Sequence, residues 1–284
     1  MGCRGMLGAE LARLLEKTGV AYVGTDCDID ITNKAALAAF ARGKSIGWIV
    51  NCAAYTAVDN AEDDAEACRA LNADGPANIA ALAHSIGAKL IHISTDYVFN
   101  GKGSRPYAET DAPDPIGVYG RTKYDGEKKL LAANAESYVV RSAWLYGAYG
   151  KNFVDTMLRL MRERDSVSVV NDQRGSPTWA RDLASAIIAL MKNPAPYGTY
   201  HFTGAGDCTW FEFAEAIYRK GREIGLLDKD CAVKACASSE YPAKVARPAY
   251  SVLDKQKIKT ALGIDIPSWD ASLTVFLQEK EIAP

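Results

Sequence analysis

The stretch that decides the fold is Gly2-Cys3-Arg4-Gly5-Met6-Leu7-Gly8, which opens the chain and leads into a helical pattern over residues 8–18. Glycines three residues apart suit a loop that enters a helix. One allows the tight turn, one lets a pyrophosphate approach the backbone, and one lets the helix pack on a sheet. The positive end of the helix then faces the phosphates. This segment predicts a dinucleotide-binding loop with cofactor contacts at Gly2, Gly5, Met6, Leu7 and Gly8; the alternative is a glycine-rich tail that binds nothing.

The start of the chain departs from this pattern. A phosphate-binding loop ordinarily follows the first strand, which is central in the sheet, whereas this chain begins inside the loop. The sequence indicates a start site placed too late, or residues missing upstream. We expect a protein that begins at Met1 to be poorly soluble or to bind its cofactor weakly.

The rest of the chain alternates short β-rich runs with longer helical patterns. Strands are expected at residues 20–24, 48–52, 89–94, 137–143, 167–171 and 199–203, and helices at 8–18, 34–42, 61–86, 118–134, 153–163 and 180–192. Strands that alternate with crossover helices indicate a parallel sheet. The expected fold is α/β, a Rossmann-like doubly wound parallel sheet with a smaller C-terminal substrate-binding region.

The same pattern divides the chain into two parts. We expect residues 1–150 to form a dinucleotide-binding domain. Residues 151–284 are expected to form mainly the substrate-binding part, with some strands around 166–203 returning to the main sheet.

Composition excludes several classes of function. A net charge of −2 and a pI of about 6.0 give no electrostatic reason to expect a nucleic-acid partner. No apolar stretch approaches the roughly 20 residues of a membrane span. The seven cysteines include no CxxC pair, which disfavours a zinc site and a disulfide framework. We therefore expect a cytoplasmic protein without a nucleic-acid or membrane partner.

The cofactor preference stays open between NADPH and NADH. Asp26, Asp28 and Asp30 follow the expected strand at 20–24, and an acid there favours NAD because it binds the adenosine ribose. Arg4 in the glycine loop favours the 2′-phosphate of NADP instead. A solvated turn explains any one of these acids equally well.

A possible catalytic pair lies in the helix expected over residues 118–134. Tyr119 and Lys123 form a YxxxK pattern, but Tyr124 and Lys128 form another, so the spacing alone identifies no site. The two pairs face different directions, because five residues advance a helix by about 140°. Tyr119 opens the helix after a turn, whereas Tyr124 lies a full turn inside. Context therefore favours Tyr119.

Tyr119 and Lys123 are neighbours one helical turn apart. An adjacent ammonium group lowers the pKa of a tyrosine from its ordinary value of about 10. Such a phenol can protonate a carbonyl oxygen while hydride arrives at carbon. A partner hydroxyl is expected at the end of the preceding strand, where Ser94 and Thr95 stand, although turn chemistry explains either one alone.

Several segments together resemble the extended short-chain dehydrogenase/reductase family and, within it, the dTDP-4-dehydrorhamnose reductases. The resemblance spans almost the whole chain. It rests on segments that include NCAAYTAVD at 51–59, STDYVF at 94–99, VYGRTK at 118–123, RSAWLY at 141–146 and GSPT at 175–178. The most specific are TAVDNAE at 56–62 and STDYVF, together with Trp144.

The resemblance implies NAD(P)H-dependent reduction of the C4 ketone of dTDP-4-dehydro-L-rhamnose to dTDP-L-rhamnose. For catalysis it implies Thr95, Tyr119 and Lys123. For the cofactor it implies, in addition to the glycine loop, Asp30, Ile31, Ala53, Ala54, Thr56, Tyr119 and Lys123. For the dTDP-sugar it implies Thr95, Asp96, Trp144, Asn152 and Arg247. A monomer or homodimer is expected. Mg²⁺ accompanies some family members, but no local cluster of carboxylates here indicates a metal site.

Two other functions remain open at this point. An NAD-dependent nucleotide-sugar epimerase, or a dehydratase, would use the same scaffold. Tyr97 stands after Thr95-Asp96 where dehydratases tend to place a glutamate, which argues against the dehydratase. A non-catalytic regulatory subunit, like the β subunit of methionine adenosyltransferase, is the alternative from another class.

Overall fold

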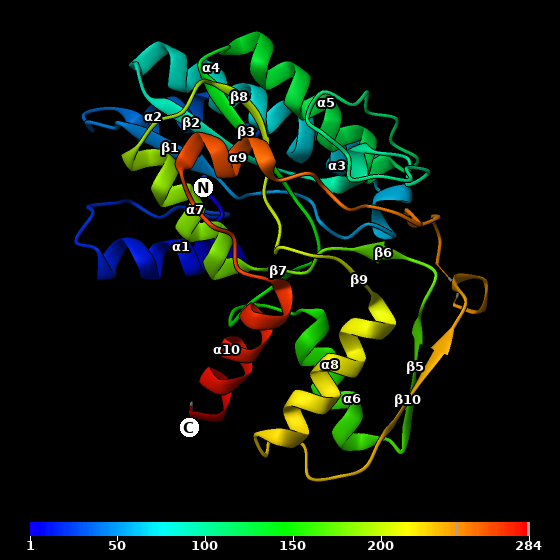
Figure 1. Ribbon diagram of the computed structural model, residues 1–284. Helices are drawn as coiled ribbons and strands as arrows, with labels where there is room; N and C mark the ends of the chain where they lie inside the picture. The colour runs from blue at the N-terminus through cyan, green and yellow to red at the C-terminus, as the bar shows by residue number, and fades with distance from the viewer. Residues whose placement is uncertain (242, 283–284) are drawn as a thin grey trace.

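The structure is a computed structural model and describes residues 1–241 and 243–282. The upper half of Figure 1 holds a four-stranded parallel sheet in the order β1-β2-β3-β8. These strands are β1 (Trp48–Asn51), β2 (Lys89–Thr95), β3 (Ser137–Ser142) and β8 (Gly198–His201). The prediction of an α/β fold built on a parallel sheet is confirmed.

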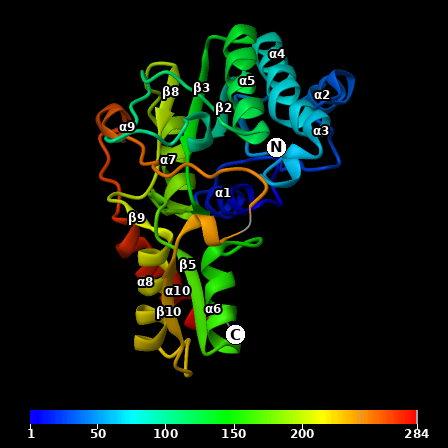
Figure 2. The same cartoon turned by 90° about the vertical axis from the view of Figure 1, so that its right-hand side faces the viewer.

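Helices cover both faces of this sheet because the strands are apolar on both sides. Leu90 and Val139 belong to a core with α2 (Lys34–Ala41), α4 (Gly75–Ile86) and α5 (Val118–Ala133). Ile91 and Val140 belong to a second core with α1 (Met6–Lys17), α7 (Ala180–Lys192) and α9 (Gln256–Leu262). Figure 2 shows the strands between α4 and α5 on one side and α7 on the other.

The lower half of Figure 1 has its own core, rich in aromatic residues. It is built from α6 (Phe153–Glu163), α8 (Trp210–Glu223), α10 (Trp269–Ile282), and the parallel pair β5 (Ser166–Val170) and β10 (Ala232–Cys236). Short pairs link the halves: β4 (Leu145–Tyr146) with β7 (Thr178–Trp179), and β6 (Arg174–Gly175) with β9 (Cys208–Thr209).

Of the strands around residues 166–203, β8 joins the main sheet, whereas β5 pairs with β10. The strand expected at residues 20–24 needs correction. Residues 20–24 form no strand, and the Val23 side chain there is 65% exposed. The helical stretch expected over 61–86 is present for most of its length: after the turn η1 (Asn60–Glu62), α3 (Ala65–Arg69), the π-turn η2 (Ala70–Asp74) and α4 follow one another without a gap.

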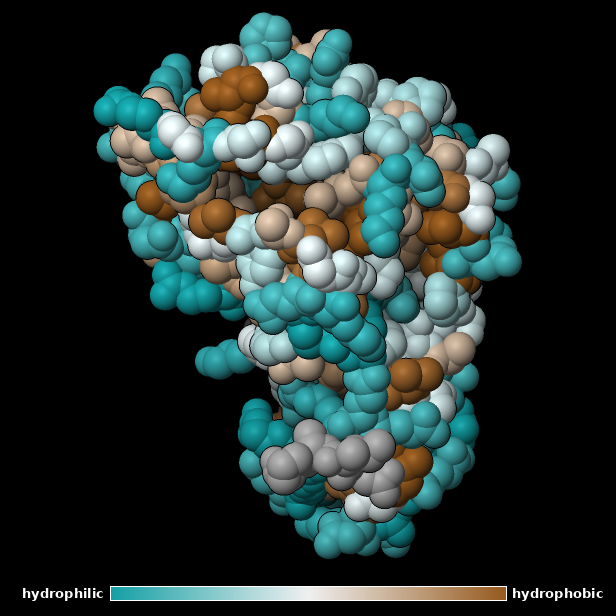
Figure 3. All heavy atoms as spheres, turned by 90° about the vertical axis from the view of Figure 1, so that its left-hand side faces the viewer, coloured by the Kyte–Doolittle hydropathy of each residue, from teal (hydrophilic) through white to brown (hydrophobic). Residues whose placement is uncertain are grey.

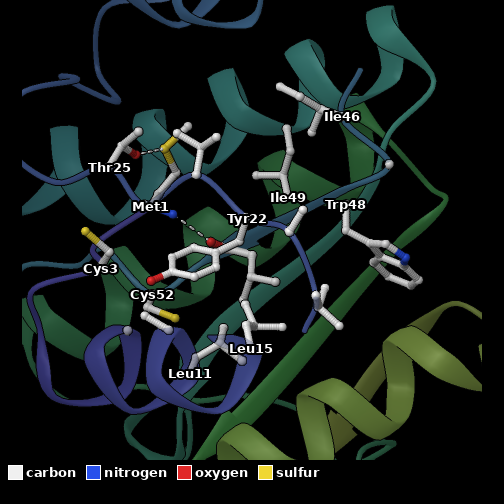
Figure 4. A pocket seen from close by; sticks show the side chains of 18 of the residues that line it. Met1, Cys3, Leu11, Leu15, Tyr22, Thr25, Ile46, Trp48, Ile49 and Cys52 are labelled. Carbon is white, nitrogen blue, oxygen red and sulfur yellow. Dashed lines mark hydrogen bonds between the residues drawn. The ribbon is translucent and has the colours of Figure 1, made fainter. Parts of the chain in front are cut away.

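An apolar groove of about 600 Å³ lies between residues 20–25 and the free edge of β1, and Figure 4 shows its lining. Met1 sits at one end of it. The Met1 amino group donates to the Val50 carbonyl at 2.9 Å, and the Cys52 N–H donates to the Met1 carbonyl at 3.1 Å. Met1 therefore pairs with β1 as the last residue of a parallel strand would.

The groove explains why residues 20–24 remain without sheet partners. They face β1 across a space lined by Leu11, Leu15, Ile49 and Phe40, rather than across a paired strand. Hydrophobic side chains also gather on the upper half of the molecular face in Figure 3. The groove lies on the side of β1 where a dinucleotide-binding sheet ordinarily has its first strand.

No helix within the described parts of the chain has the length and apolar character needed to cross a membrane.

Candidate active site

The glycine loop is close-packed, and its packing depends on missing side chains. Gly2 has a φ of +73°, and a Cβ there would stand 2.7 Å from the Ala53 nitrogen. A Cβ at Gly8 would stand 2.0 Å from the Gly2 carbonyl oxygen. The loop therefore folds back on itself and lies against residue 53, which brings together two of the predicted cofactor-binding segments.

The same loop leaves a helix end available to an anion. Gly5 is the N-cap of α1 and has no side chain to bond the first-turn N–H groups, and that turn carries no acidic residue. Unpaired N–H groups and the helix dipole favour phosphate at such a position. Met6, predicted to contact the cofactor, is the first residue of α1, and Leu7 is buried in the core. This geometry fits the pyrophosphate of a dinucleotide.

Arg4 and the acids after residue 25 meet at the mouth of the loop. The Arg4 backbone N–H donates to Asp26 at 2.9 Å, and its guanidinium lies 3.6 Å from Asp28. Asp30 accepts bonds from the N–H and hydroxyl of Thr32, so its carboxylate shapes a turn. Ile31 is buried against Gly75, so only its backbone can face a ligand.

Ser94 and Thr95, the two hydroxyl residues at the end of β2, face opposite sides of the strand. The Ser94 hydroxyl donates to Glu127 at 2.5 Å, and Glu127 forms a buried ion pair with Arg141. Thr95 points the other way: its hydroxyl donates to Asp96 at 3.0 Å and also bonds with Tyr119. Because successive strand residues face opposite sides, only Thr95 lies beside the tyrosine.

Asp96 is deeply buried. Burial raises the pKa of its carboxyl to about 6, although bonds from the Ser251 and Thr95 hydroxyls oppose that shift. Its Oδ2 atom is buried without a hydrogen-bond partner. A buried carboxyl oxygen that lacks a partner is a candidate acceptor for a ligand hydroxyl.

Tyr119 stands in the first turn of α5. Gly120 allows the helix to approach closely, since a Cβ there would lie 2.2 Å from the Tyr97 carbonyl oxygen. The Tyr97 and Tyr119 rings then meet edge to face, with centroids 5.4 Å apart. The lowered pKa expected for the Tyr119 phenol is wrong: burial raises that pKa above its ordinary value, and the bond with Thr95 opposes this shift. The phenol is therefore held protonated, as a proton donor must be.

Lys123 lies one turn further along α5 and is 2% exposed. Its amine donates to the Ile93 carbonyl at 2.7 Å and lies 3.4 Å from Nε2 of His92. Burial lowers the pKa of Lys123 to about 8, and the negative charge of Glu127 opposes that shift. The amine is thus held against the end of β2, with a pKa shifted toward neutral pH.

The competing YxxxK pair lies elsewhere. Tyr124 packs beside Val98, Phe99 and Leu253, and Lys128 is paired with Asp125 at 2.8 Å. The Lys128 amine lies over the Tyr124 ring rather than beside its hydroxyl. The two pairs therefore lie in different surroundings, and the choice of Tyr119 stays a prediction.

Trp144 has an unusual backbone and a close partner. Its φ of 48° lies in the left-handed region, which non-glycine residues occupy at a cost of about 1–3 kcal/mol. Its indole stacks on Trp210, with centroids 3.6 Å apart, and a Cβ at Gly175 would lie 2.5 Å from it. The tryptophan is therefore held between two segments of the C-terminal half.

The two residues predicted to contact a diphosphate differ in whether they have a polar atom available for a ligand. Arg247 bonds Asp59 at 2.7 Å, while its Nη1 and the Asp59 Oδ1 are buried without partners. Asn152 caps α6: its amide oxygen accepts from the Asp155 N–H, and its amide nitrogen donates to the Gly147 carbonyl. Arg247 has a free donor for a ligand, whereas Asn152 already uses its polar atoms.

Sequence reasoning missed several residues around this site. Tyr97 lies against Tyr119, Asp59 pairs with Arg247, His92 faces Lys123, and Trp210 stacks on Trp144. Tyr97 and Asp59 stood inside segments that carried the resemblance, so those segments were the available signal. No local pattern pointed to His92 or Trp210, because their roles depend on contacts distant in sequence. Within residues 1–241 and 243–282, no group of three or more potential metal ligands comes together.

Known proteins match this chain along its length. The family described as RmlD substrate binding domain matches residues 1–282. The dTDP-4-dehydrorhamnose reductase of Streptomyces griseus is 42% identical over 280 residues, which span 96% of this chain and 90% of that protein. The corresponding crystal structure from Clostridium acetobutylicum is 39% identical, covers 99% of this chain and 98% of its own, and has a TM-score of 0.93.

A second solved relative was determined with its cofactor. The dTDP-4-dehydrorhamnose reductase of Bacillus anthracis, in complex with NADP, is 38% identical, with a TM-score of 0.92 and coverage of 98% of this chain and 97% of its own. The resemblance found in the sequence is confirmed: this chain belongs to the family described as RmlD substrate binding domain.

Proposed function

We propose that this protein reduces the C4 ketone of dTDP-4-dehydro-L-rhamnose to dTDP-L-rhamnose with NADPH or NADH. The observation that carries the proposal is the buried Tyr119 phenol, bonded to Thr95 at the carboxyl end of the sheet and followed one turn later by Lys123. Ligands of open α/β sheets bind at that edge. Relatives about 40% identical over their length are named for this reaction.

In this proposal the glycine loop holds the dinucleotide. Gly2, Gly5, Met6, Leu7 and Gly8 contact the pyrophosphate, while Asp30 and Ile31 lie near the adenine, and Ala53, Ala54 and Thr56 line the rest of the cofactor. When bound, the reduced nicotinamide supplies a hydride. Lys123 holds the nicotinamide ribose and stabilises the phenolate.

The chain's own residues handle the proton. On substrate binding the single proton of the Thr95 hydroxyl, which Asp96 accepts in this structure, is donated to the ketone oxygen instead and orients that oxygen toward Tyr119. Tyr119 then gives its phenolic proton to that oxygen as it becomes an alkoxide, which avoids a free charge in a buried site. The Lys123 ammonium stabilises the phenolate that remains.

The substrate lies between the two halves of the chain. Asp96 accepts a bond from a sugar hydroxyl through its unpartnered oxygen, Trp144 packs an indole face on the 6-deoxy ring, and Arg247 binds the diphosphate. Asn152 was also predicted here; its contact with the substrate stays a prediction, since its described bonds cap α6. We propose the division into a cofactor part, residues 1–150, and a mainly substrate-binding part, residues 151–284.

The test is a spectrophotometric assay of NADPH and NADH. We expect the absorbance at about 340 nm, which marks the reduced nicotinamide, to fall only when the 4-keto sugar nucleotide is present, with one cofactor oxidised per sugar reduced. An epimerase would interconvert sugar nucleotides without net loss of cofactor. A regulatory subunit would neither oxidise the cofactor nor convert the sugar nucleotide. Either result would overturn the proposal.

A further inference from the structure

A chain of three buried polar side chains ends at Lys123, one helical turn after the proposed catalytic tyrosine. Asn51 and His92 are fully buried, and Lys123 is 2% exposed. Nδ2 of Asn51 lies 3.0 Å from Nδ1 of His92, and Nε2 of His92 lies 3.4 Å from the Lys123 amine. These contacts join β1, β2 and α5. Only Lys123 has a role in the proposed reaction, so the other two require an explanation.

The orientation of the Asn51 amide is fixed by the backbone. Its Oδ1 accepts a bond from the Ala53 N–H at 3.1 Å, and an N–H group can only donate. The amide nitrogen therefore faces His92 and donates to Nδ1. An imidazole that accepts at Nδ1 must, when neutral, carry its proton on Nε2. His92 is neutral, because complete burial holds its pKa well below the ordinary value.

The Nε2–H of His92 then points at the amine of Lys123. An ammonium group has three donors and no acceptor, so two donors would oppose each other across this contact. An uncharged amine has a lone pair, which can accept from Nε2–H while an amine N–H donates to the Ile93 carbonyl at 2.7 Å. The arrangement of donors thus favours the uncharged form.

We propose that His92, held by Asn51 with its proton on Nε2, is a positioning residue that favours the uncharged amine of Lys123. The other titratable groups that act on the amine are Glu127 on its own helix, Cys52 after β1, and Cys68 on α3. Glu127 favours the ammonium form, whereas burial disfavours it. His92 adds a hydrogen bond from Nε2–H that only the uncharged amine can accept, an effect that neither burial nor net charge provides.

The inference has a consequence for turnover, and this part of it rests on the proposed function. Because the proposed reaction uses the ammonium form of Lys123, kcat/KM falls as the pH rises through the pKa of Lys123, which is about 8. Asn51→Asp replaces the donor at Nδ1 by an acceptor, while its other oxygen still accepts from Ala53. The His92 proton then moves to Nδ1, and Nε2 becomes an acceptor for the ammonium. We expect the alkaline limb of kcat/KM to move up by about one pH unit.

A double-mutant cycle separates this relay from simple charge. The new carboxylate of Asn51→Asp also attracts the ammonium directly, and that attraction persists when His92 is replaced. We therefore compare Asn51→Asp in the wild-type background and in a His92→Leu background. A shift at least twofold larger with His92 present supports the relay; equal shifts in the two backgrounds overturn it.

The tautomer is measured independently of activity and of the His92→Leu variant. The chain has three histidines, and ¹⁵N spectra distinguish protonated from unprotonated ring nitrogens. The His92 signals are those that Asn51→Asp changes. We expect a protonated Nε2 in the wild-type protein and a protonated Nδ1 in Asn51→Asp. A wild-type protein protonated on Nδ1 overturns the inference even if it reduces the sugar. The expected tautomer in a protein that fails to consume cofactor supports the inference and refutes only the proposed function.

Discussion

The indoles of Trp144 and Trp210 lie face to face, with centroids 3.6 Å apart and planes 9° from parallel. The two residues come from different halves of the chain, since Trp144 follows the sheet strand β3 and Trp210 begins α8. Trp144 also has a left-handed backbone, so its position is maintained by its neighbours rather than by local preference. Trp210 is therefore the support of the proposed sugar-binding indole.

We predict that Trp210→Leu raises KM for the sugar nucleotide about 2–10-fold, because an aromatic pair contributes roughly 0.5–1.5 kcal/mol beyond its buried area. The Kd for NADPH, measured by fluorescence, should not change. Trp48→Leu is the matched control, as Trp48 stacks on Tyr138 in another part of the fold. Unchanged sugar binding in Trp210→Leu would show that Trp144 needs no such support.

Tyr119→Phe removes the phenolic proton and leaves the ring in contact with Tyr97. We predict a loss of about 10²–10⁴-fold in kcat, the usual contribution of a positioned acid. Tyr124→Phe, in the rival YxxxK pair, should retain nearly full turnover, because Tyr124 packs in a separate apolar cluster. Steady-state kinetics measure both variants. A large loss of kcat in Tyr124→Phe, with kcat retained in Tyr119→Phe, would show that Tyr124 is the proton donor.

Gly8→Ala places a methyl group 2.0 Å from the Gly2 carbonyl oxygen. In an ordinary helix this change is stabilising by roughly 0.5–1 kcal/mol, but here the loop must move away. We predict at least tenfold weaker NADPH binding by fluorescence titration. Gly47→Ala is the control, since its Cβ would meet nothing within 4 Å. Equal NADPH affinities in the two variants would mean that the loop does not hold the pyrophosphate.

We predict that Arg4 favours NADPH over NADH, because its guanidinium stands at the mouth of the glycine loop, beside Asp26 and Asp28. A charged hydrogen bond contributes about 1.5–3 kcal/mol. Solvent screens this exposed site, so Arg4→Ala should lower the ratio of kcat/KM for NADPH to that for NADH by about tenfold. The exposed Arg42→Ala variant should leave the ratio unchanged. An unaltered ratio in Arg4→Ala would assign the selectivity to another group.

The groove beside β1 can accept an engineered strand. Met1 already pairs in parallel register, so a residue placed two positions before it would donate to the Trp48 carbonyl and accept from the Val50 N–H. We predict that an N-terminal extension of five valine and isoleucine residues raises Tm by several degrees through apolar burial. An extension of five glycine and serine residues should not. Equal Tm values for both would show that the groove does not accept a strand.

Parts of the site were predictable because they depend on short spacings. The glycine loop, the Tyr119–Lys123 pair and the hydroxyl at the end of β2 each follow from a strand or helix period within a few residues. The choice of Thr95 over Ser94 came from the resemblance, and the structure places Ser94 against Glu127 on the other side of β2. The strand expected at residues 20–24 did not form, because a strand requires a paired neighbour and its own sequence cannot provide one.

The sequence by itself determined the α/β class, since apolar strands alternating with helical periods bury their surfaces only in a layered parallel sheet. It also placed Tyr119 and Lys123 on one helix face, because that relation is a matter of helical period alone. Only the tertiary structure decided which strands pair, as when β5 joined β10 rather than the main sheet. It also brought Trp210 to Trp144 and His92 to Lys123. Such contacts arise from packing between segments distant in the chain, and no local pattern of residues encodes them.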